Sequence, residues 1–161
     1  MDNNKYTIVN DNGNGVYEIE AKNSNIHYYV NENKKTVAAV MRNNKVQVEK
    51  ELNILFDKYV PIDIWFASDF ASYEIKKFIK NTYKGKAHCI KDDKFDLETG
   101  MKIAREHMLA DYYCDRTNCF IAVSDKLSNL IYELEERIAV STERAEKFID
   151  ASNENYENAH K

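Results

Sequence analysis

The sequence predicts a single α+β domain in which an N-terminal antiparallel sheet of about four strands precedes two middle helices and a long C-terminal helical part. Residues 1–43 alternate apolar and polar side chains, whereas from residue 44 apolar side chains recur every three or four positions. The 161 residues include only four glycines and one proline, so long regular elements are expected. We expect one core from the sheet, a mixed region (44–96) and the helical part (97–150), followed by a polar tail (151–161).

Four strands are expected within residues 1–43, in segments separated by polar turns. Asn12-Gly13 and Asn14-Gly15 lie between the first two segments, and both pairs favour the positive φ angles that tight hairpins require. The polar stretch NENKK separates the third segment from the fourth. Strands joined by such short turns pair antiparallel. In chain order, the four segments read KYTIV, VYEIEAKN, IHYYV and TVAAVMRN.

The first middle helix is expected to begin at Asn44 and to end before Pro61. A residue that precedes proline disfavours the helical conformation, so the helix has a natural end there. The apolar residues in this stretch are spaced by roughly three and four positions, which is the period of a helix. They are Val46, Val48, Leu52, Leu55, Phe56 and Tyr59.

A second helix and a short strand are expected to follow. The segment IDIWFAS is interpreted as a buried strand or an extended segment. Ser68 or Asp69 can then cap a helix that continues to Tyr83, and Gly85 is expected to end that helix. The segment KAHCI is expected to be a short strand.

The last 61 residues, Met101–Lys161, contain neither glycine nor proline and are expected to be helical. Apolar residues recur every eleven positions, which matches a nearly straight helix. Two alternatives remain: one helix continuing to about Ala139, or a helical hairpin broken between 115 and 125, where Thr117-Asn118 and Ser124-Asp125 are good caps. The residues at the eleven-residue spacing are Met101, Tyr112, Val123, Leu134 and Ala145.

Composition and charge narrow the class of protein. No apolar run approaches the eighteen residues that cross a bilayer, and the N-terminus lacks the pattern of a signal peptide, so a cytosolic protein is expected. Three cysteines are an odd number, which indicates a reducing compartment rather than a disulfide framework. Residues 1–123 carry 18 acidic and 18 basic side chains, whereas residues 124–161 carry nine and five. Any binding of nucleic acid must therefore be local.

Within the segment Lys86–His107, residues 86–98 combine a histidine, a cysteine and four carboxylates, but their geometry argues against a metal site. His88 and Cys89 are neighbours on a strand, so their side chains point to opposite faces. Asp96 is suited to cap the helix that follows, and Gly100 inside the first turn predicts a close contact with backbone or a bulky ring. We expect a strand-to-helix joint and no metal or other cofactor.

One pattern lies at this joint: Ala87-x-Cys89-x-x-x-Asp93-x-Phe95-Asp96-x-x-x-Gly100-x-x-Ile103-Ala104. Followed by a long helix, this pattern resembles a segment of small uncharacterised accessory proteins encoded by bacteriophages and prophages of low-GC Gram-positive bacteria. It covers residues 87–104 only, and in that group the position of His107 is more often arginine. The resemblance brings no catalytic residues. It implies a phage origin and, through that origin, an accessory role in infection.

A cluster of lysines alternates with aromatic residues between residues 73 and 86, and such a cluster can bind phosphates and stacked bases. Tyr73, Phe78 and Ile79 are also spaced as the buried face of a helix, which would leave the lysines as its solvated side. A solvated face, a surface for an acidic partner and a nucleic-acid site all remain open. The residues concerned are Lys76, Lys77, Lys80, Lys84, Lys86, Tyr73 and Tyr83.

The C-terminal helix carries an apolar stripe beside many glutamates. The stripe is either part of the core or a surface that binds a partner, including a second copy of the chain, since so long a helix exceeds a small domain. The stripe residues are Leu127, Ile131, Leu134, Ile138, Ala145 and Phe148. The acidic residues beside them are Glu133, Glu135, Glu136, Glu143 and Glu146.

The function expected from these features is that of a non-enzymatic phage protein in the host cytoplasm. The sequence has no phosphate-binding glycine loop, nucleophile elbow or zinc-hydrolase helix. We expect the protein to bind and inhibit a host protein, with a defence complex such as a CRISPR nuclease as the favoured target. The glutamates and the lysine cluster are its expected contact surfaces. The alternative is a nucleic-acid-binding protein that uses the lysine cluster.

Overall fold

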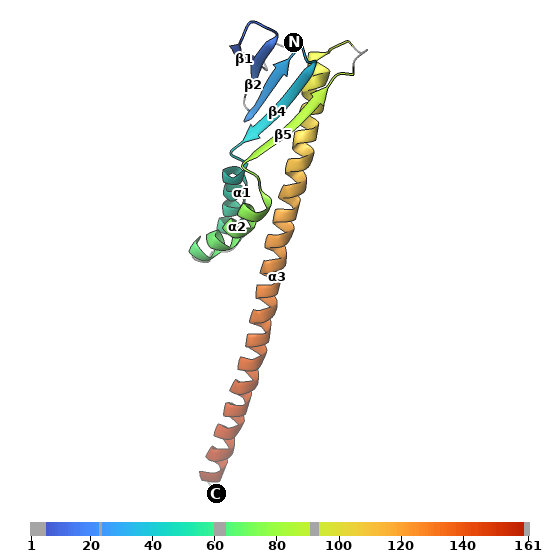
Figure 1. The fold of residues 1–161 in the computed structure, drawn as a ribbon. Helices are drawn as coiled ribbons and strands as arrows, with labels where there is room; N and C mark the ends of the chain where they lie inside the picture. The colour runs from blue at the N-terminus through green and yellow to red at the C-terminus, as the bar shows by residue number, and fades with distance from the viewer. Residues whose placement is uncertain (1–5, 23, 60–63, 91–93, 160–161) are drawn as a thin grey trace. The chain divides into compact units, whose positions relative to one another are not determined.

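The structure, a computed structural model, describes residues 6–22, 24–59, 64–90 and 94–159 (Figure 1). The chain divides into two compact units, which we call the N-terminal unit (Met1–Phe120) and the C-terminal unit (Ile121–Lys161). In chain order, the elements are β1 (Tyr6–Asp11), β2 (Val16–Ala21), β3 (Ile26–Asn31), β4 (Thr36–Arg42), α1 (Asn44–Tyr59), α2 (Ile64–Phe78), β5 (Thr82–His88) and α3 (Leu97–Ala159).

The N-terminal unit contains one antiparallel sheet, which confirms the α+β class. Its strands lie in the order β1-β2-β3-β4-β5, so each strand pairs with its neighbour in the sequence. The four predicted N-terminal strands are all present. The predicted short strand is longer than KAHCI and joins the same sheet as β5, which makes five strands. Gly13 and Gly15 adopt φ angles of 72° and 67° in the first hairpin, as the Asn-Gly pairs predicted.

One face of the sheet packs against the first part of α3, and alternation along the strands decides which residues it buries. On β5, Tyr83, Gly85 and Ala87 are buried while the lysines between them are exposed. A Cβ atom on Gly85 would lie 2.0 Å from the carbonyl oxygen of Ala104 and 2.5 Å from the amide nitrogen of Met108. Glycine is thus required where the backbone of α3 crosses β5.

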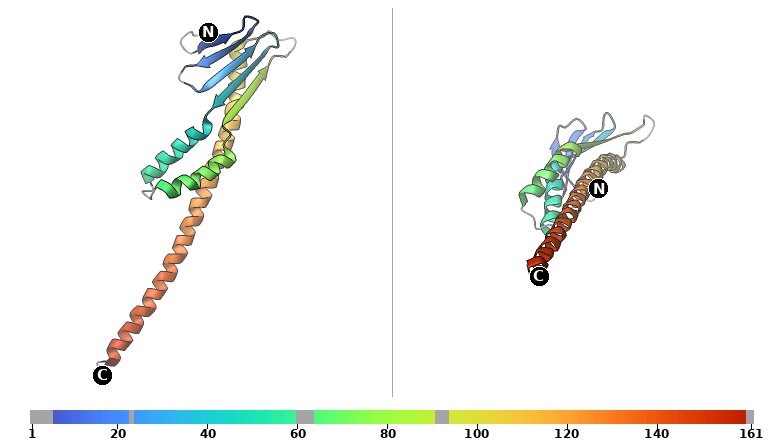
Figure 2. Two further views of the ribbon diagram at one scale, coloured as in Figure 1. Left: turned by 60° about the vertical axis from the view of Figure 1, so that its left-hand side comes forward. Right: turned by 90° about the horizontal axis from the view of Figure 1, so that it is seen from below.

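The helices α1 and α2 form an insertion, which we call the excursion, between the adjacent strands β4 and β5 (Figures 1 and 2). Arg42 at the end of β4 pairs with Thr82 at the start of β5, so the chain leaves the sheet and returns at one place. We call this place the neck of the excursion. The buried Asn44 side chain joins its two sides by donating hydrogen bonds to the carbonyls of Met41 and Asn81, both at 3.1 Å. Among the described residues, the buried apolar side chains of α1 and α2 are Val48, Leu52, Phe56, Ala71 and Ile75, and Ile79 is buried directly after α2.

The prediction for α1 is confirmed, but the prediction for the segment after it is wrong in three places. The segment Ile64–Ser68 is helical rather than extended, and Ser68 and Asp69 lie inside α2 instead of capping it. Four consecutive apolar or aromatic residues have no period, so helix and strand could not be told apart there. The helix also ends at Phe78, which puts Tyr83 and Gly85 in β5. Pro61, Ile62 and Asp63 lie outside the described residues.

The C-terminal part is one helix, α3, so the hairpin alternative is wrong. Its apolar residues keep one face in phase, and no glycine or proline after Gly100 interrupts it. The helix runs through the segment 151–159, which the sequence predicted as a polar tail. Within the N-terminal unit this helix buries Met101, Ala104, Met108, Tyr112 and Cys119.

The start of α3 has the cap that the sequence predicted. Asp96 accepts hydrogen bonds from the Glu98 amide at 3.2 Å and from the Thr99 hydroxyl, and its own carbonyl accepts one from the Gly100 amide. The bond from Thr99 is the largest cause that lowers the pKa of the Asp96 carboxyl. The close contact expected at Gly100 is also present, because a Cβ there would lie 2.9 Å from Val37 Cγ2. The neighbour is a valine side chain rather than backbone or a ring.

Candidate binding surfaces

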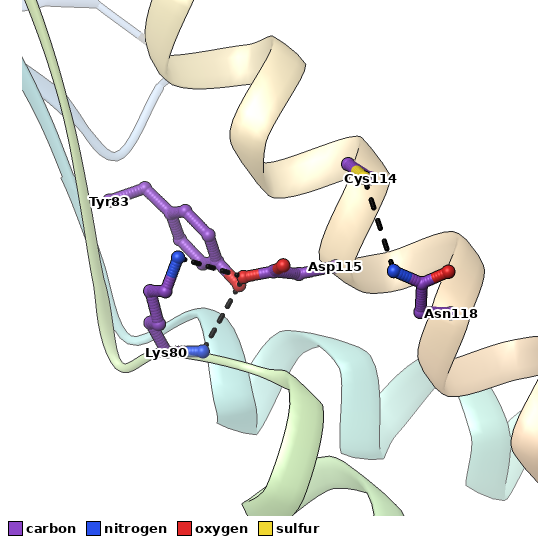
Figure 3. A network of polar contacts seen from close by, with 5 residues as sticks. All are labelled: Lys80, Tyr83, Cys114, Asp115 and Asn118. Carbon is purple, nitrogen blue, oxygen red and sulfur yellow. Dashed lines mark hydrogen bonds and ion pairs between the residues drawn. The ribbon is translucent and has the colours of Figure 1, made fainter.

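A polar network around Asp115 holds α3 against β5 and the end of α2 (Figure 3). The Tyr83 hydroxyl donates to Asp115 Oδ2 at 2.9 Å and accepts from the Lys80 amide at 3.0 Å. The Lys80 ammonium lies 3.2 Å from the same carboxylate oxygen. Burial raises the pKa of Tyr83, and the Asp115 carboxylate raises it further. Tyr83 is only 2% exposed, so it belongs to the core rather than to a contact surface.

The lysine cluster is divided among three elements. Lys76 and Lys77 lie in the last turn of α2, Lys80 lies between α2 and β5, and Lys84 and Lys86 lie on β5. All five are exposed, and Lys80 is engaged with Asp115 as described above. The expectation of a single basic helix face is therefore replaced by two surfaces, one on α2 and one on the sheet.

The three residues that the sequence placed on a buried helix face, Tyr73, Phe78 and Ile79, differ in their exposure. Tyr73, which the sequence placed on the buried face of the helix, is 62% exposed, so that prediction is wrong. Ile79 is 2% exposed, as predicted. The Lys77 ammonium lies 4.8 Å from the ring centre of Phe78, which is half-buried. The helix turns Ala71 and Ile75 inward, and Tyr73, two positions from each, points away from that face.

The sheet face opposite α3 carries Lys84 and Lys86 beside polar residues of β2 and β3. Strand register places Val40 between Lys84 and His27, and Ala38 between Lys86 and Tyr29. Strands lie about 4.8 Å apart, so each lysine starts about 10 Å from its counterpart on β3. This exposed surface therefore combines cations with a histidine and a tyrosine.

Glu18 is the centre of a second polar network on this open face. The His27 Nδ1 atom lies 3.2 Å from Glu18 Oε1, without the alignment of a hydrogen bond. Strand register pairs Tyr29 with Glu18, and Arg42 donates to the Tyr29 hydroxyl at 3.2 Å. Burial raises the pKa of Tyr29, and the Glu18 carboxylate adds to the effect. This network was not predicted from the sequence. The signal that could have revealed it is that Glu18, His27 and Tyr29 occupy alternate positions on two segments expected to pair as strands.

Described residues of the segment Lys86–His107, between Ala87 and Ile103, line a cleft of about 450 Å³ where β4, β5 and α3 meet. Its walls include Lys35, His88, Cys89 and Lys94. His107 does not line it, because its Nδ1 atom lies 3.1 Å from the carbonyl oxygen of Lys86. Across the part of the chain that the structure describes, no three histidine, cysteine or carboxylate groups are placed to hold a metal ion. Asp92 and Asp93 lie outside that part.

The C-terminal unit exposes large apolar side chains together with carboxylates. Ile131 is 57% exposed, Leu134 50%, Ile138 64% and Phe148 77%. The five predicted glutamates are exposed on the same helix. One of them, Glu143, accepts a hydrogen bond from Lys147 at 2.7 Å across one helical turn. A surface of this composition is suited to binding a protein, because apolar contact and charge are available together.

Comparisons with protein-family models, with curated proteins and with solved structures give no match for the chain. Among the helices over residues that the structure describes, none is long and apolar enough to cross a membrane. The geometry of the chain itself is therefore the basis for identifying candidate sites. They are two: the helical surface of the C-terminal unit and the open face of the sheet.

Proposed function

We propose that the protein is a non-enzymatic binding protein that occupies a basic surface of a partner protein through its C-terminal unit. The observation that carries this proposal is the exposure of the glutamates on α3 beside large exposed apolar side chains. The C-terminal unit carries nine acidic and five basic side chains, whereas the rest of the chain is balanced. An acidic helix is attracted by a cationic groove, and such attraction speeds association and selects the partner.

The favoured partner is a host protein with a groove that binds nucleic acid, such as a CRISPR nuclease complex. Two features support this part of the proposal. The resemblance of residues 87–104 to phage accessory proteins suggests a role against the host, and a row of carboxylates can compete with phosphates for the cations of such a groove. The protein would then inhibit its target in the host cytoplasm by blocking access of the nucleic acid.

Affinity capture from host extract followed by mass spectrometry tests the proposal. We expect the full chain to recover a host protein that binds nucleic acid, and the recovery to fall as salt is raised. The double change Glu136→Lys and Glu143→Lys should abolish the recovery. Glu20→Lys with Glu49→Lys is the matched control, because it makes the same charge change at exposed positions of the N-terminal unit. If no host protein is recovered above background, the proposal is wrong.

A second candidate function is binding of single-stranded nucleic acid on the open face of the sheet. The observation in its favour is that Lys84 and Lys86 share this face with His27, Tyr29 and Arg42, so cations and flat rings lie together. The acidic Glu18 and Glu20 on the same face oppose it.

A mobility-shift titration with single-stranded RNA and DNA separates the two functions. If the sheet binds, affinity should fall with salt, and Lys84→Glu with Lys86→Glu should remove the shift. Lys34→Glu with Lys50→Glu changes the charge equally at other exposed positions and should reduce affinity much less. Absence of any shift at low salt would exclude this second function and leave the first unaffected.

A further inference from the structure

We infer that residues 127–148 of α3 pair with the same residues of a second copy as a parallel, in-register, two-stranded coiled coil. The pairing surface consists of seven positions spaced alternately by four and three residues, which is the heptad pattern of a coiled coil. These positions are Leu127, Ile131, Leu134, Ile138, Ser141, Ala145 and Phe148. The inference does not rest on the function proposed above, because the pairing involves no host protein.

The pairing surface is exposed in the single chain from Ile131 to Phe148, and Leu127 at its start is half-buried. Ile131, Leu134, Ile138 and Phe148 are all at least half exposed. The surface spans 22 residues, or about 33 Å of helix at 1.5 Å per residue. Soluble proteins rarely leave so continuous an apolar surface in contact with water. Serine occupies the equivalent positions on either side of the surface, at 124 and 152, and also position 141 within it.

The identity of the core residues selects two helices rather than three or four. With Leu134 at position d of the heptad, Ile131 and Ile138 fall at position a and Leu127 falls at d. Branched residues at a with leucine at d favour a parallel dimer, whereas isoleucine at both positions or leucine at a favours larger bundles. The central layers of the surface thus have the composition of a dimer.

The charges beside the core select the parallel arrangement. Arg137 and Arg144 both fall at position g. In a parallel pair, position g faces position e of the next heptad in the partner, where Thr142 and Ile149 stand opposite the arginines. In an antiparallel pair with the same core, Arg137 would face Arg144 of the second copy, and the two positive charges would repel.

The proposed dimer leaves the acidic surface accessible. Glu133, Glu136, Glu143 and Glu146 fall at positions b, c and f, which point away from the partner helix. Pairing would therefore hide the apolar residues and present the glutamates twice. Lys147 engages Glu143 within its own helix and is not needed across the pair.

Sedimentation equilibrium of the full chain over a range of concentrations tests the pairing. We expect twice the chain mass of 18.8 kDa at high concentration. The double change Leu134→Lys and Ile138→Lys should leave only the monomer mass. Val140→Lys is the matched control, since Val140 is an exposed apolar residue of the same helix at the outward position c, and it should sediment as the unchanged chain does. A monomer at all concentrations, a trimer, or equal disruption by Val140→Lys would overturn the inference.

A gain of stability provides an independent check on the register. Ser141 occupies position d and contributes little to an apolar core. Ser141→Leu should lower the dissociation constant of the dimer at least tenfold in a parallel in-register pair, because leucine would meet leucine. Ser128→Leu, at the flanking position e, is the matched change outside the core and should alter the constant much less. An unchanged constant for Ser141→Leu contradicts the proposed register.

Cross-linking tests the direction of the helices. In a chain in which the three native cysteines are replaced by alanine, Leu127→Cys should oxidise to a covalent dimer, because identical d positions of a parallel pair lie within disulfide reach. In the antiparallel pair described above, residue 127 lies near residue 152 of the second copy, about 37 Å away along the helix. Circular dichroism verifies that the replaced chain keeps its helix content. A folded chain that sediments as a dimer without forming this cross-link would overturn the parallel arrangement.

Discussion

The two parts of α3 carry similar apolar stripes, but the stripe is buried in the N-terminal unit and exposed in the C-terminal unit. In the N-terminal unit, Met108 is fully buried and Tyr112 is 4% exposed, because the sheet and the α1–α2 pair cover the stripe. In the C-terminal unit, Leu134 and Ile138 are at least half exposed. The spacing of apolar residues alone therefore does not distinguish a core from a binding surface. What distinguishes them is whether the unit that contains the stripe also contains other elements that cover it.

The largest expected effect comes from shortening a side chain in the buried part. Met108→Ala should lower the free energy of unfolding by about 2 to 5 kcal/mol, because it leaves a cavity in the core. Val140→Ala, at a position 43% exposed in the C-terminal unit, should change it by less than about 0.5 kcal/mol. Urea unfolding followed by tryptophan fluorescence measures both, since the single tryptophan, Trp65, lies in α2. Equal effects would remove the distinction between the two parts.

A smaller effect is expected where α3 crosses β5. Gly85→Ala should cost about 2 to 3 kcal/mol, because the new methyl group meets the backbone of α3, which must move. Gly100→Ala should change the stability by less than about 1 kcal/mol. The methyl group there meets only the Val37 side chain, and alanine is a better helix former than glycine. Thermal unfolding of both variants measures the difference, and a larger loss for Gly100→Ala would contradict the described crossing.

The Tyr83–Asp115 contact predicts a dependence of stability on alkaline pH. Because the pKa of Tyr83 is raised in the folded chain, its contribution is fully present below pH 10, where tyrosine is also neutral when unfolded. The contribution is lost as pH rises above 10, since the unfolded chain then releases the proton first. Tyr83→Phe should cost about 1 kcal/mol at pH 8 and should make the decline above pH 10 shallower.

The control for this measurement is Tyr132→Phe, which changes a tyrosine that is 70% exposed in the C-terminal unit. We expect it to alter neither the stability at pH 8 nor the slope above pH 10. Denaturant titrations at several pH values give both quantities. A slope that is the same for the unchanged chain and Tyr83→Phe would show that this tyrosine is not the group responsible.

The smallest expected effects concern two ion pairs. Arg116 donates to Glu51 Oε2 at 3.1 and 2.8 Å and connects α3 to α1, but both side chains are about a third exposed. Glu51→Gln should therefore cost about 0.5 to 1 kcal/mol, an effect that 1 M salt should reduce. Glu143→Gln breaks a pair within one helix and should leave the fluorescence transition unchanged. A shift of that transition by Glu143→Gln would indicate that the pair stabilises the core.

The sequence was sufficient to predict most of the fold, because most elements have a clear period. The four N-terminal strands alternate, and α1 has the helical spacing of Val48, Leu52 and Phe56. The wrong predictions concern segments in which the period of apolar residues is absent or was assigned to the wrong element. The start of α2 is a run of apolar residues without a period. In β5, Tyr83, Gly85 and Ala87 alternate with lysines, but Tyr83 was predicted to belong to the helix before it and Gly85 to end that helix.

The candidate surfaces were predicted less completely. The glutamates and the stripe of the C-terminal unit could be found because they lie on one helix, where spacing fixes the face. The network of Glu18, His27 and Tyr29 could not be found in this way, because strand register brings its members together. The division of the lysine cluster has the same origin, since Lys76 and Lys86 belong to elements whose relation is set by tertiary packing.

The neck at Asn44 has a consequence for how this fold can vary. Because Arg42 and Thr82 are direct partners in the sheet, everything between them is an insertion into a hairpin that is complete without it. A hairpin can close over two residues or over a pair of helices, because the entropic cost of loop closure grows only slowly with length. The excursion is thus a place where the chain can change the length or identity of a subdomain while the order and register of all five strands stay fixed.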